Sequence, residues 1–255
     1  MSVLLRKPDQ GKVFDATCRH GASNRFMRTG QYLRFADWRF INRARLDVLL
    51  LNGARRWGDG DKRCRKCGYQ AETLPHVLCH CGPHSAARQL RYNAIVERLA
   101  AASRLPEEVR INQTVVVINV TVAFENKRED IEKARWEKIH KYRPLANAIA
   151  NSGHVVHVDG FVVGALRAWH SNNESICKLL RISPGYASLM RKLMVSETIA
   201  WSRDVYVEHV SGIRQYCVQG STAREAAPST STSARVNTSA ANALITGSET
   251  IAAQQ

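Results

Sequence analysis

Four residues between positions 64 and 81 have the types and the spacing of a metal site. Cys64 and Cys67 are separated by two residues and followed by Gly68, the form of a turn that brings two thiolates to one ion. His76 and Cys81 follow at a spacing that lets a short helix return an imidazole and a third thiolate. The pattern C-x2-C-x8-H-x4-C therefore predicts a zinc knuckle in which these four side chains hold one Zn²⁺ ion.

Other donors lie close enough in the sequence to compete for the ion. His80 follows His76 by one helical turn, and Cys79 and His84 are also within reach. Thr73 is expected to cap the short helix, which favours His76 as the ligand. The alternative to any metal site is a set of reduced, buried cysteines, which often behave as small apolar residues.

The cysteine content also restricts the compartment. Four of the seven cysteines lie between positions 64 and 81, which is typical of a protein in a reducing compartment, nuclear or cytoplasmic, and not of a disulfide framework. Apolar runs are short and flanked by charge, so we expect no membrane-spanning helix, no secretory signal and no membrane partner. No pattern indicates a small-molecule substrate.

The net charge of +15 predicts a polyanionic partner, because each phosphate that a cation contacts releases counterions. Residues 1–113 hold 21 Lys and Arg against 10 Asp and Glu, whereas residues 114–255 hold 16 against 12. The excess surrounds the predicted zinc knuckle, which favours DNA or RNA as the partner over a basic surface that serves solubility alone. The candidate contacts are Arg39, Arg43, Arg45, Arg55, Arg56, Arg63, Arg65 and Lys66.

Hydrophobic periodicity indicates where the chain is ordered. Residues 1–30 have no sustained period and are expected to be poorly ordered. Residues 31–106 hold a helix over 32–51, the knuckle and a second helix over 85–102. The arginines of the first helix are either a solvated face or phosphate contacts. Residues 218–255 contain 12 Ser and Thr and no apolar face, so they are expected to form a disordered tail.

The region between the knuckle and the tail alternates strand and helix signals. A β-branched run over 114–125 predicts a central strand covered on both faces, and residues 154–163 predict a second strand region with a turn or bulge at Asp159-Gly160. Between them, a period of 3.6 over 128–149 predicts a long helix, and residues 171–213 are predicted helical. A strand, a helix and a strand in this order predict an α/β fold with helices packed on a mixed sheet.

The predicted long helix has an unusual apolar stripe that includes a lysine and a tyrosine. Its members are Ile131, Ala134, Lys138, Tyr142, Leu145 and Ile149. The lysine either lays its stem along apolar surface with its ammonium in water, or places a cation near a scissile phosphate, as nucleases do. The sequence of residues 107–217 leaves both readings open.

Many short motifs, in the same order, resemble the C-terminal part of site-specific non-LTR retrotransposon polyproteins. The similarity runs from about Phe35 to Tyr216. The motifs are Phe40-Ile-Asn-Arg-Ala-Arg-Leu46, Arg56-Trp57-Gly58, the knuckle with Glu72-Thr-Leu-Pro-His-Val-Leu78, Arg91-Tyr-Asn-Ala-Ile95, Val120-Thr-Val-Ala-Phe-Glu-Asn126, Lys138-Ile-His-Lys-Tyr142, Val163-Gly-Ala-Leu166 with Trp169, Trp201-Ser-Arg-Asp204 and Glu208-His209.

The resemblance implies a zinc knuckle followed by a restriction-like endonuclease of the PD-(D/E)xK type. In that family this region follows the reverse transcriptase, and the endonuclease nicks target DNA to prime reverse transcription. No Asp-Asp polymerase motif occurs in this chain. Residues 107–217 are thus expected to form the nuclease-like domain without its polymerase.

The chain departs from the family at the acids that bind the catalytic metal. Asn119 replaces the second aspartate of the family, and an amide is a weaker ligand for a divalent ion than a carboxylate. Pro8-Asp9 is the only Pro-Asp pair and precedes the knuckle, so the strand that carries the family's first aspartate is missing. Because motifs match on both sides, we infer a deletion between about Gln113 and Thr114.

The residues that remain of the family's nuclease site are Glu125, Lys138 and Tyr142. We therefore expect a degenerate, inactive nuclease joined to a zinc-dependent nucleic-acid-binding region. One alternative is an active nuclease that binds Mg²⁺ or Mn²⁺ with Glu125 in place of a lost acid. Another is a structural or protein-binding module adopted by a host, whose basic charge is incidental.

Overall fold

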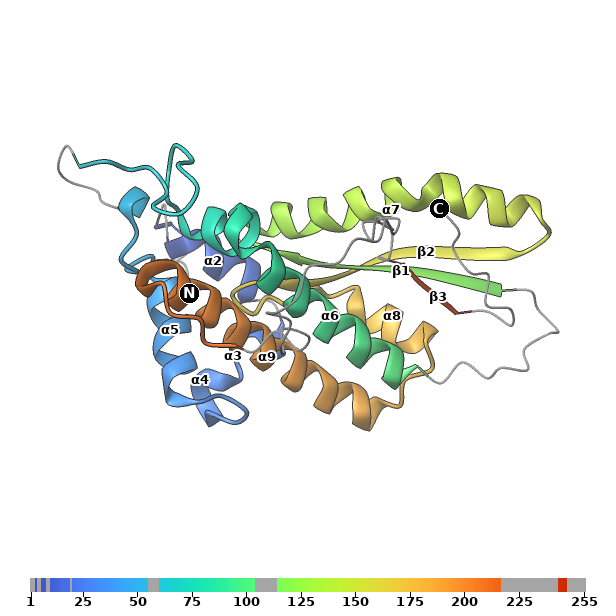
Figure 1. Cartoon of the computed structure of the whole chain (residues 1–255). Coiled ribbons are helices and arrows are strands. Elements are labelled where there is room, and N and C mark those ends of the chain that lie inside the picture. The colour runs from blue at the N-terminus through green and yellow to red at the C-terminus, as the bar shows by residue number, and fades with distance from the viewer. Residues whose placement is uncertain are drawn as a thin grey trace, which may run out of the picture.

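A parallel pair of long strands forms the centre of the molecule (Figure 1). Strands β1 (Thr114–Ala123) and β2 (Val155–Gly164) pair along their whole lengths. Helix α7 (Arg128–Asn151) connects them, so the predicted strand, helix and strand are confirmed. The computed structural model describes residues 3, 6–7, 10–18, 20–54, 60–103, 114–216 and 243–246.

Helices cover both faces of this sheet. Alternate side chains of β1, such as Ile118 and Val120, pack against α6 (Ser85–Ala102), α8 (Asn173–Leu179) and α9 (Pro184–Ser211). Helix α7 lies along the other face in Figure 1. The β-branched run predicted a doubly covered strand, and the burial of every residue from 115 to 120 confirms it.

A third strand makes the sheet mixed. Strand β3 (Ala243–Thr246) pairs antiparallel with β1, and the strand order is β2-β1-β3. The expectation of a disordered tail over 218–255 is therefore wrong for these four residues. The other positions of that predicted tail lie outside the described residues.

The N-terminal segment is not the unstructured region that the sequence suggested. Its described part forms three short helices, α2 (Gln10–Thr17), α3 (Gly21–Asn24) and α4 (Phe26–Thr29). Ser23 is fully buried, and its hydroxyl accepts a hydrogen bond from the backbone N–H of Trp169. Polar contacts with distant residues, which leave no periodic signal in the sequence, hold this segment on the rest of the molecule.

The first arginine-bearing helix is shorter than predicted, whereas the second matches the prediction. Helix α5 (Phe35–Arg45) ends where Asp47 adopts a left-handed conformation with φ of +55°, so residues 46–51 are not helical. A 3₁₀ turn, η1 (Asn52–Ala54), follows. Helix α6 begins and ends within the predicted limits of 85–102.

The turn or bulge predicted at Asp159-Gly160 is absent, because β2 includes both residues and its register with β1 continues through them without a break. The Asp159 carboxylate forms an ion pair with Arg135 of α7 at 2.7 Å. A β-carbon on Gly160 would lie 3.0 Å from the carbonyl oxygen of Arg135. The absence of a side chain at Gly160 thus lets α7 and β2 approach each other closely, which is a common reason for a glycine within a strand.

The two predicted domains share one core. Residues 64–81, which hold the four predicted metal ligands, are called the metal-site segment. Phe40 of α5 and Leu78 of this segment belong to the same apolar cluster as Leu166 and Ile199. Helix α9 contacts α5, α6 and the metal-site segment. The expected boundary at residue 106 lies outside the described residues, but the elements on its two sides pack together. None of the described helices has the length and apolarity needed to cross a membrane.

Two glycines allow a matched test of this packing. A β-carbon on Gly164 would lie 1.9 Å from Glu125 Oε1 and 2.7 Å from Cβ of Ala168, whereas one on Gly185 would meet nothing within 4 Å. Gly164→Ala should lower the free energy of unfolding by about 2 kcal/mol or more through overpacking. Gly185→Ala should be neutral or stabilising by about 0.5 kcal/mol. Urea denaturation measures both, and equal effects would contradict the packing described.

Candidate metal centre and basic surfaces

The first two cysteines lie on a tight turn. The backbone N–H of Gly68 donates to the carbonyl of Cys64 at 2.8 Å, and the N–H of Cys64 donates to the carbonyl of Tyr69 at 2.8 Å. Gly68 has φ of +73°, a left-handed conformation that favours glycine. These bonds turn the chain back within a few residues and bring the side chains of Cys64 and Cys67 to the same side.

The other two donors are positioned by one turn of π-helix, η2 (His76–His80). The N–H of Cys81 donates to the carbonyl of His76 at 2.8 Å, and the Thr73 hydroxyl accepts a longer bond from the N–H of His76 at 3.4 Å. Such turns are rare and occur often at functional sites. The wider turn brings His76 and Cys81, five residues apart, back to one place.

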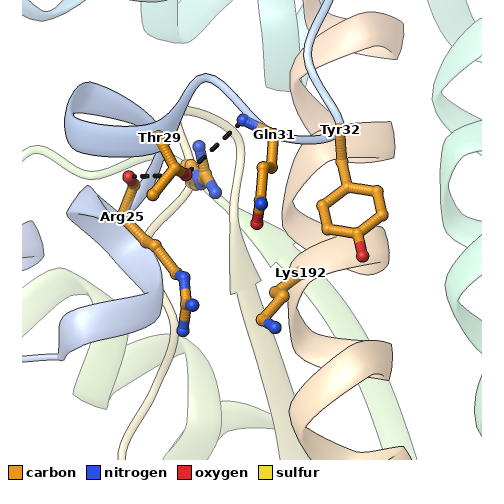
Figure 2. Close-up of a pocket in the computed structure, with 6 residues that line it drawn as sticks. Arg25, Thr29, Gln31, Tyr32 and Lys192 are labelled. Carbon is orange, nitrogen blue, oxygen red and sulfur yellow. Dashed lines mark hydrogen bonds between the residues drawn. The ribbon is translucent and has the colours of Figure 1, made fainter.

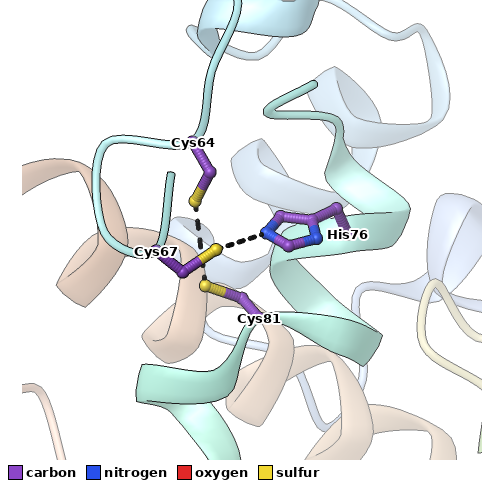
Figure 3. A group of neighbouring side chains, drawn as sticks. All are labelled: Cys64, Cys67, His76 and Cys81. Carbon is purple, nitrogen blue, oxygen red and sulfur yellow. Dashed lines mark hydrogen bonds between the residues drawn. The ribbon is translucent and has the colours of Figure 1, made fainter. Parts of the chain in front are cut away.

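The four predicted ligands converge, as Figure 3 shows. The sulfur atoms of Cys64 and Cys81 are 3.8 Å apart, and Cys67 Sγ lies 3.2 Å from His76 Nε2. One donor atom from each residue lies within 4.8 Å of the others. In a tetrahedral site, metal bonds of about 2.3 Å to sulfur and 2.0 Å to nitrogen require separations of roughly 3.5 to 3.8 Å. The sulfur pair has this spacing, and the Cys67–His76 pair is slightly closer. The cysteine–histidine cluster, defined by these four residues, thus fits a metal ion such as zinc.

Two of the competing donors are turned elsewhere. His80 is exposed and belongs to none of the described groups that could share an ion. Cys79 packs against the apolar core beside α5, and burial raises the pKa of its thiol. The structure therefore separates these two side chains from the cluster.

The protonation of the cluster is set by burial and by neighbouring sulfur atoms. Burial and the adjacent Cys64 raise the pKa of Cys81 to about 12, so a cation is needed to hold its thiolate. A hydrogen bond from the N–H of Tyr69 is the main cause of the lowered pKa of Cys67. Burial lowers the pKa of His76, which favours the neutral imidazole that binds metals.

Beneath the cluster lies a buried polar network that the sequence analysis did not find. His209 near the end of α9 approaches Cys64 Sγ to 4.0 Å and donates from Nε2 to Glu72 Oε1 at 2.8 Å. Its Nδ1 shares a hydrogen bond of 2.9 Å with His84 Nε2. Alternative three-residue groups, Cys81 with His84 and His209 or Cys64 with Glu72 and His209, could also hold an ion. His84, a competitor from the sequence, is thus close to the site but outside the four-residue group.

Glu72 is the acceptor on which this network depends. Burial would raise its pKa, but hydrogen bonds from Arg65, the N–H of Asn52 and His209 outweigh it and lower the pKa to about 2. The Arg65 guanidinium reaches both carboxylate oxygens at 2.8 Å. Arg65, predicted to contact nucleic acid, therefore forms an internal ion pair with Glu72.

Apart from Arg45, the remaining predicted nucleic-acid contacts fall into three groups. The side chains of Arg39, Arg43 and Lys66 are exposed and have no hydrogen bond or ion pair with any residue that the structure describes. Arg63 pairs with Asp61 at the surface. Arg55 and Arg56 lie outside the described residues.

Arg45 has a structural role instead of the predicted one. Its guanidinium donates to the carbonyl oxygens of Leu166 and Ser23 and to the side chain of Asn24. Burial lowers its pKa to about 10, an effect that nearby Glu125 partly offsets. Helix α5 turns this arginine inward, so it ties the N-terminal segment to the turn after β2.

A second basic surface consists of residues that were not among the predicted nucleic-acid contacts. Figure 2 shows Arg25 and Lys192 pointing into one shallow hollow, with Gln31 and Tyr32 beside them. The buried Arg167 also lines this hollow, and burial lowers its pKa to about 9. Only the fold brings these cations together, since they come from three distant segments.

The predicted nuclease residues are only partly assembled. Lys138 lines a cleft of about 280 Å³ between α6, β1 and α7, together with Arg88, Tyr92 and Thr121. Its ammonium has no hydrogen bond or ion pair within the described structure, and burial lowers its pKa. The cleft thus presents a cation to solvent, as the nuclease hypothesis requires.

Glu125 does not take part in this cleft, contrary to the prediction. It is fully buried, and its carboxylate accepts hydrogen bonds from the N–H groups of Leu166 and Ala168 at 2.7 to 2.8 Å. Burial raises its pKa to about 6 despite these bonds. Its role is to hold the turn after β2, where it cannot also serve as a metal ligand facing Lys138.

Asn119 and Tyr142 also lie outside the lining of the cleft. Asn119 lies within β1, which continues to Ala123, and the residue is only 1% exposed. Strand alternation places Asn119 on the face that α7 covers, opposite to Ile118 and Val120. Among the described residues, every group of His, Cys, Asp and Glu able to share an ion lies at the cysteine–histidine cluster.

Comparison with known proteins adds no assignment. The sequence matches no protein-family model, and a search of the curated proteins also returns no match.

Substitution of the ligands and of one near neighbour tests the metal site. Purified full chain should contain one zinc ion, and Cys64→Ser or His76→Ala should remove it, because a lost ligand leaves the site three-coordinate. His80→Ala is the matched control, and it should keep the ion because His80 points away from the cluster. Elemental analysis after gel filtration gives the stoichiometry. Retention by His76→Ala together with loss in His80→Ala would reverse the assignment.

Proposed function

We propose that this chain binds nucleic acid through a basic surface that one zinc ion orders. We further propose that it is the knuckle and nuclease-like part of a non-LTR retrotransposon polyprotein without its polymerase. The convergence of Cys64, Cys67, His76 and Cys81 is the observation that carries the proposal, because it fits the motif on which the resemblance depends. In this proposal the compartment is nuclear or cytoplasmic, where the thiols stay reduced.

Exposed cations without internal partners support the choice of a polyanion. Arg39 and Arg43 of α5 and Lys66 of the metal-site segment carry charges that no described acid neutralises. The hollow of Arg25 and Lys192 adds a second concentration of positive charge. A phosphate that binds cations in such positions contributes more binding free energy than one that binds cations already held in ion pairs, because no existing interaction is broken.

The nuclease-like region is proposed to be inactive. A two-acid site needs carboxylates near the cation, whereas Glu125 is bonded to backbone N–H groups and position 119 is an amide. The second candidate function, an active nuclease, rests on the half-buried Lys138, which lines the cleft. A protein-binding module remains the alternative if the chain does not bind nucleic acid.

Removing two unpaired arginines should weaken nucleic-acid binding. In Arg39→Gln/Arg43→Gln, the affinity for a labelled oligonucleotide should fall about tenfold, and the slope of log affinity against log salt should become shallower by about 2, one per lost phosphate contact. Lys133→Gln/Lys141→Gln removes the same charge from exposed positions of α7 and should have a much smaller effect. Fluorescence anisotropy across a salt series measures both. A wild-type affinity that does not change with salt concentration would contradict the proposal.

Plasmid nicking distinguishes the inactive from the active nuclease. With Mg²⁺ or Mn²⁺ and supercoiled plasmid, wild type should nick no faster than Lys138→Ala, because the described cleft offers no pair of carboxylates. Asn119→Asp should also remain inactive, since one restored acid does not complete the site. Nicking by wild type that Lys138→Ala abolishes would establish the active nuclease.

A further inference from the structure

Helix α5 has two stripes of side chains with different surroundings. Asp37, Phe40, Ile41 and Ala44 are buried and hold the helix on the core. Phe35, Trp38, Arg39, Asn42 and Arg43 repeat at i, i+3, i+4, i+7 and i+8, so they share another face. That spacing usually marks an apolar stripe against a core, but here it contains two arginines and remains largely exposed.

The aromatic residues of this second stripe are open to solvent. Phe35 is 72% exposed and Trp38 is 40% exposed. Their rings are nearly parallel, with centroids 6.0 Å apart and planes 11° from each other. Exposed rings of this size are costly in water, and a neighbouring pair on an ordered helix indicates a surface that binds something.

The charge on the same face indicates what that partner is. Arg39 follows Phe35 by one helical turn, and Arg43 follows Arg39 by another, and neither side chain has a partner in the described structure. Aromatic rings interleaved with cations match a nucleic-acid strand, whose bases stack on the rings while its phosphates meet the arginines. An apolar protein partner would leave both arginines without a counter-charge.

We propose that Phe35, Trp38, Arg39 and Arg43 form a stacking surface for single-stranded nucleic acid. In an intact duplex the faces of the bases are stacked on one another, so only single-stranded segments or ends present a face to Phe35 and Trp38. This inference rests on the proposed nucleic-acid binding and specifies its form. The arginines bind either form of nucleic acid, whereas the rings select the single strand.

The test compares a single strand and a duplex with variants of the full chain. Fluorescence anisotropy is measured with labelled oligothymidylate of about 15 nucleotides and with a DNA duplex of about the same length, within the range of single-strand site sizes. Trp38→Ala and Phe35→Ala should each weaken single-strand binding about five- to a hundredfold, the range observed for the loss of one stacked base. Their affinity for the duplex should change less than about twofold.

Trp136→Ala is the matched control. Trp136 is 47% exposed on α7, and the guanidinium of Arg135 lies 5.1 Å from its ring centroid. This tryptophan is also exposed beside an arginine, but it belongs to a different surface. Its loss should leave affinity for both probes unchanged.

Conservative variants separate stacking from simple apolar contact. Trp38→Phe keeps a flat ring and should retain most of the single-strand affinity. Phe35→Leu keeps apolar area without a ring and should lose as much affinity as Phe35→Ala. Because Phe35 is largely exposed and Trp38 is partly exposed, all these variants should unfold at temperatures close to that of wild type.

Each remaining outcome contradicts a distinct claim. If wild type binds neither probe, the proposed function fails. If wild type binds both probes, but Trp38→Ala and Phe35→Ala lower the affinity for both equally or for neither, the stacking surface is refuted while nucleic-acid binding stands. If these variants instead abolish self-association seen by sedimentation, and binding is unaffected, the surface is a protein interface and the inference is wrong.

Discussion

The buried carboxylate of Glu72 is the point at which the metal-site segment and the C-terminal helix meet. It accepts hydrogen bonds from Arg65, from the N–H of Asn52 and from His209 of α9, and its own exposure is 0%. An ionised carboxylate without partners would be strongly unfavourable in such a place. The charge therefore fixes the positions of three segments at once, and one of them carries Cys64 immediately before Arg65.

This arrangement explains why the cysteine–histidine cluster is part of the larger fold. Small zinc modules usually derive their folding free energy from the metal. Here Leu78 also packs into a core shared with α5 and α9, and His209 lies 4.0 Å from Cys64 Sγ. The segment that carries the cluster is thus held by the shared apolar core and by α9.

Local signals in the sequence predicted the two long strands, helices α6 and α7 and the convergence of the cysteine–histidine cluster, whereas long-range polar contacts could not be predicted. These features follow from periodicity and spacing, which are properties of nearby residues. The contact between Glu72 and His209 joins residues 137 positions apart, although His209 belongs to a motif of the family resemblance. The internal partners of Glu125 and Arg45 were missed for the same reason: a charged side chain that bonds a distant backbone group looks, in sequence, like one that binds a ligand.

X-ray absorption at the zinc edge of the purified full chain tests the central claim most directly, because it reports the atoms bound to the metal. The account predicts three sulfur neighbours at about 2.3 Å and one nitrogen at about 2.0 Å, from Cys64, Cys67, Cys81 and His76. A first shell of one sulfur and two nitrogens, as Cys81, His84 and His209 would supply, would contradict it. So would a shell of oxygen atoms alone, the signature of an ion bound elsewhere on the surface.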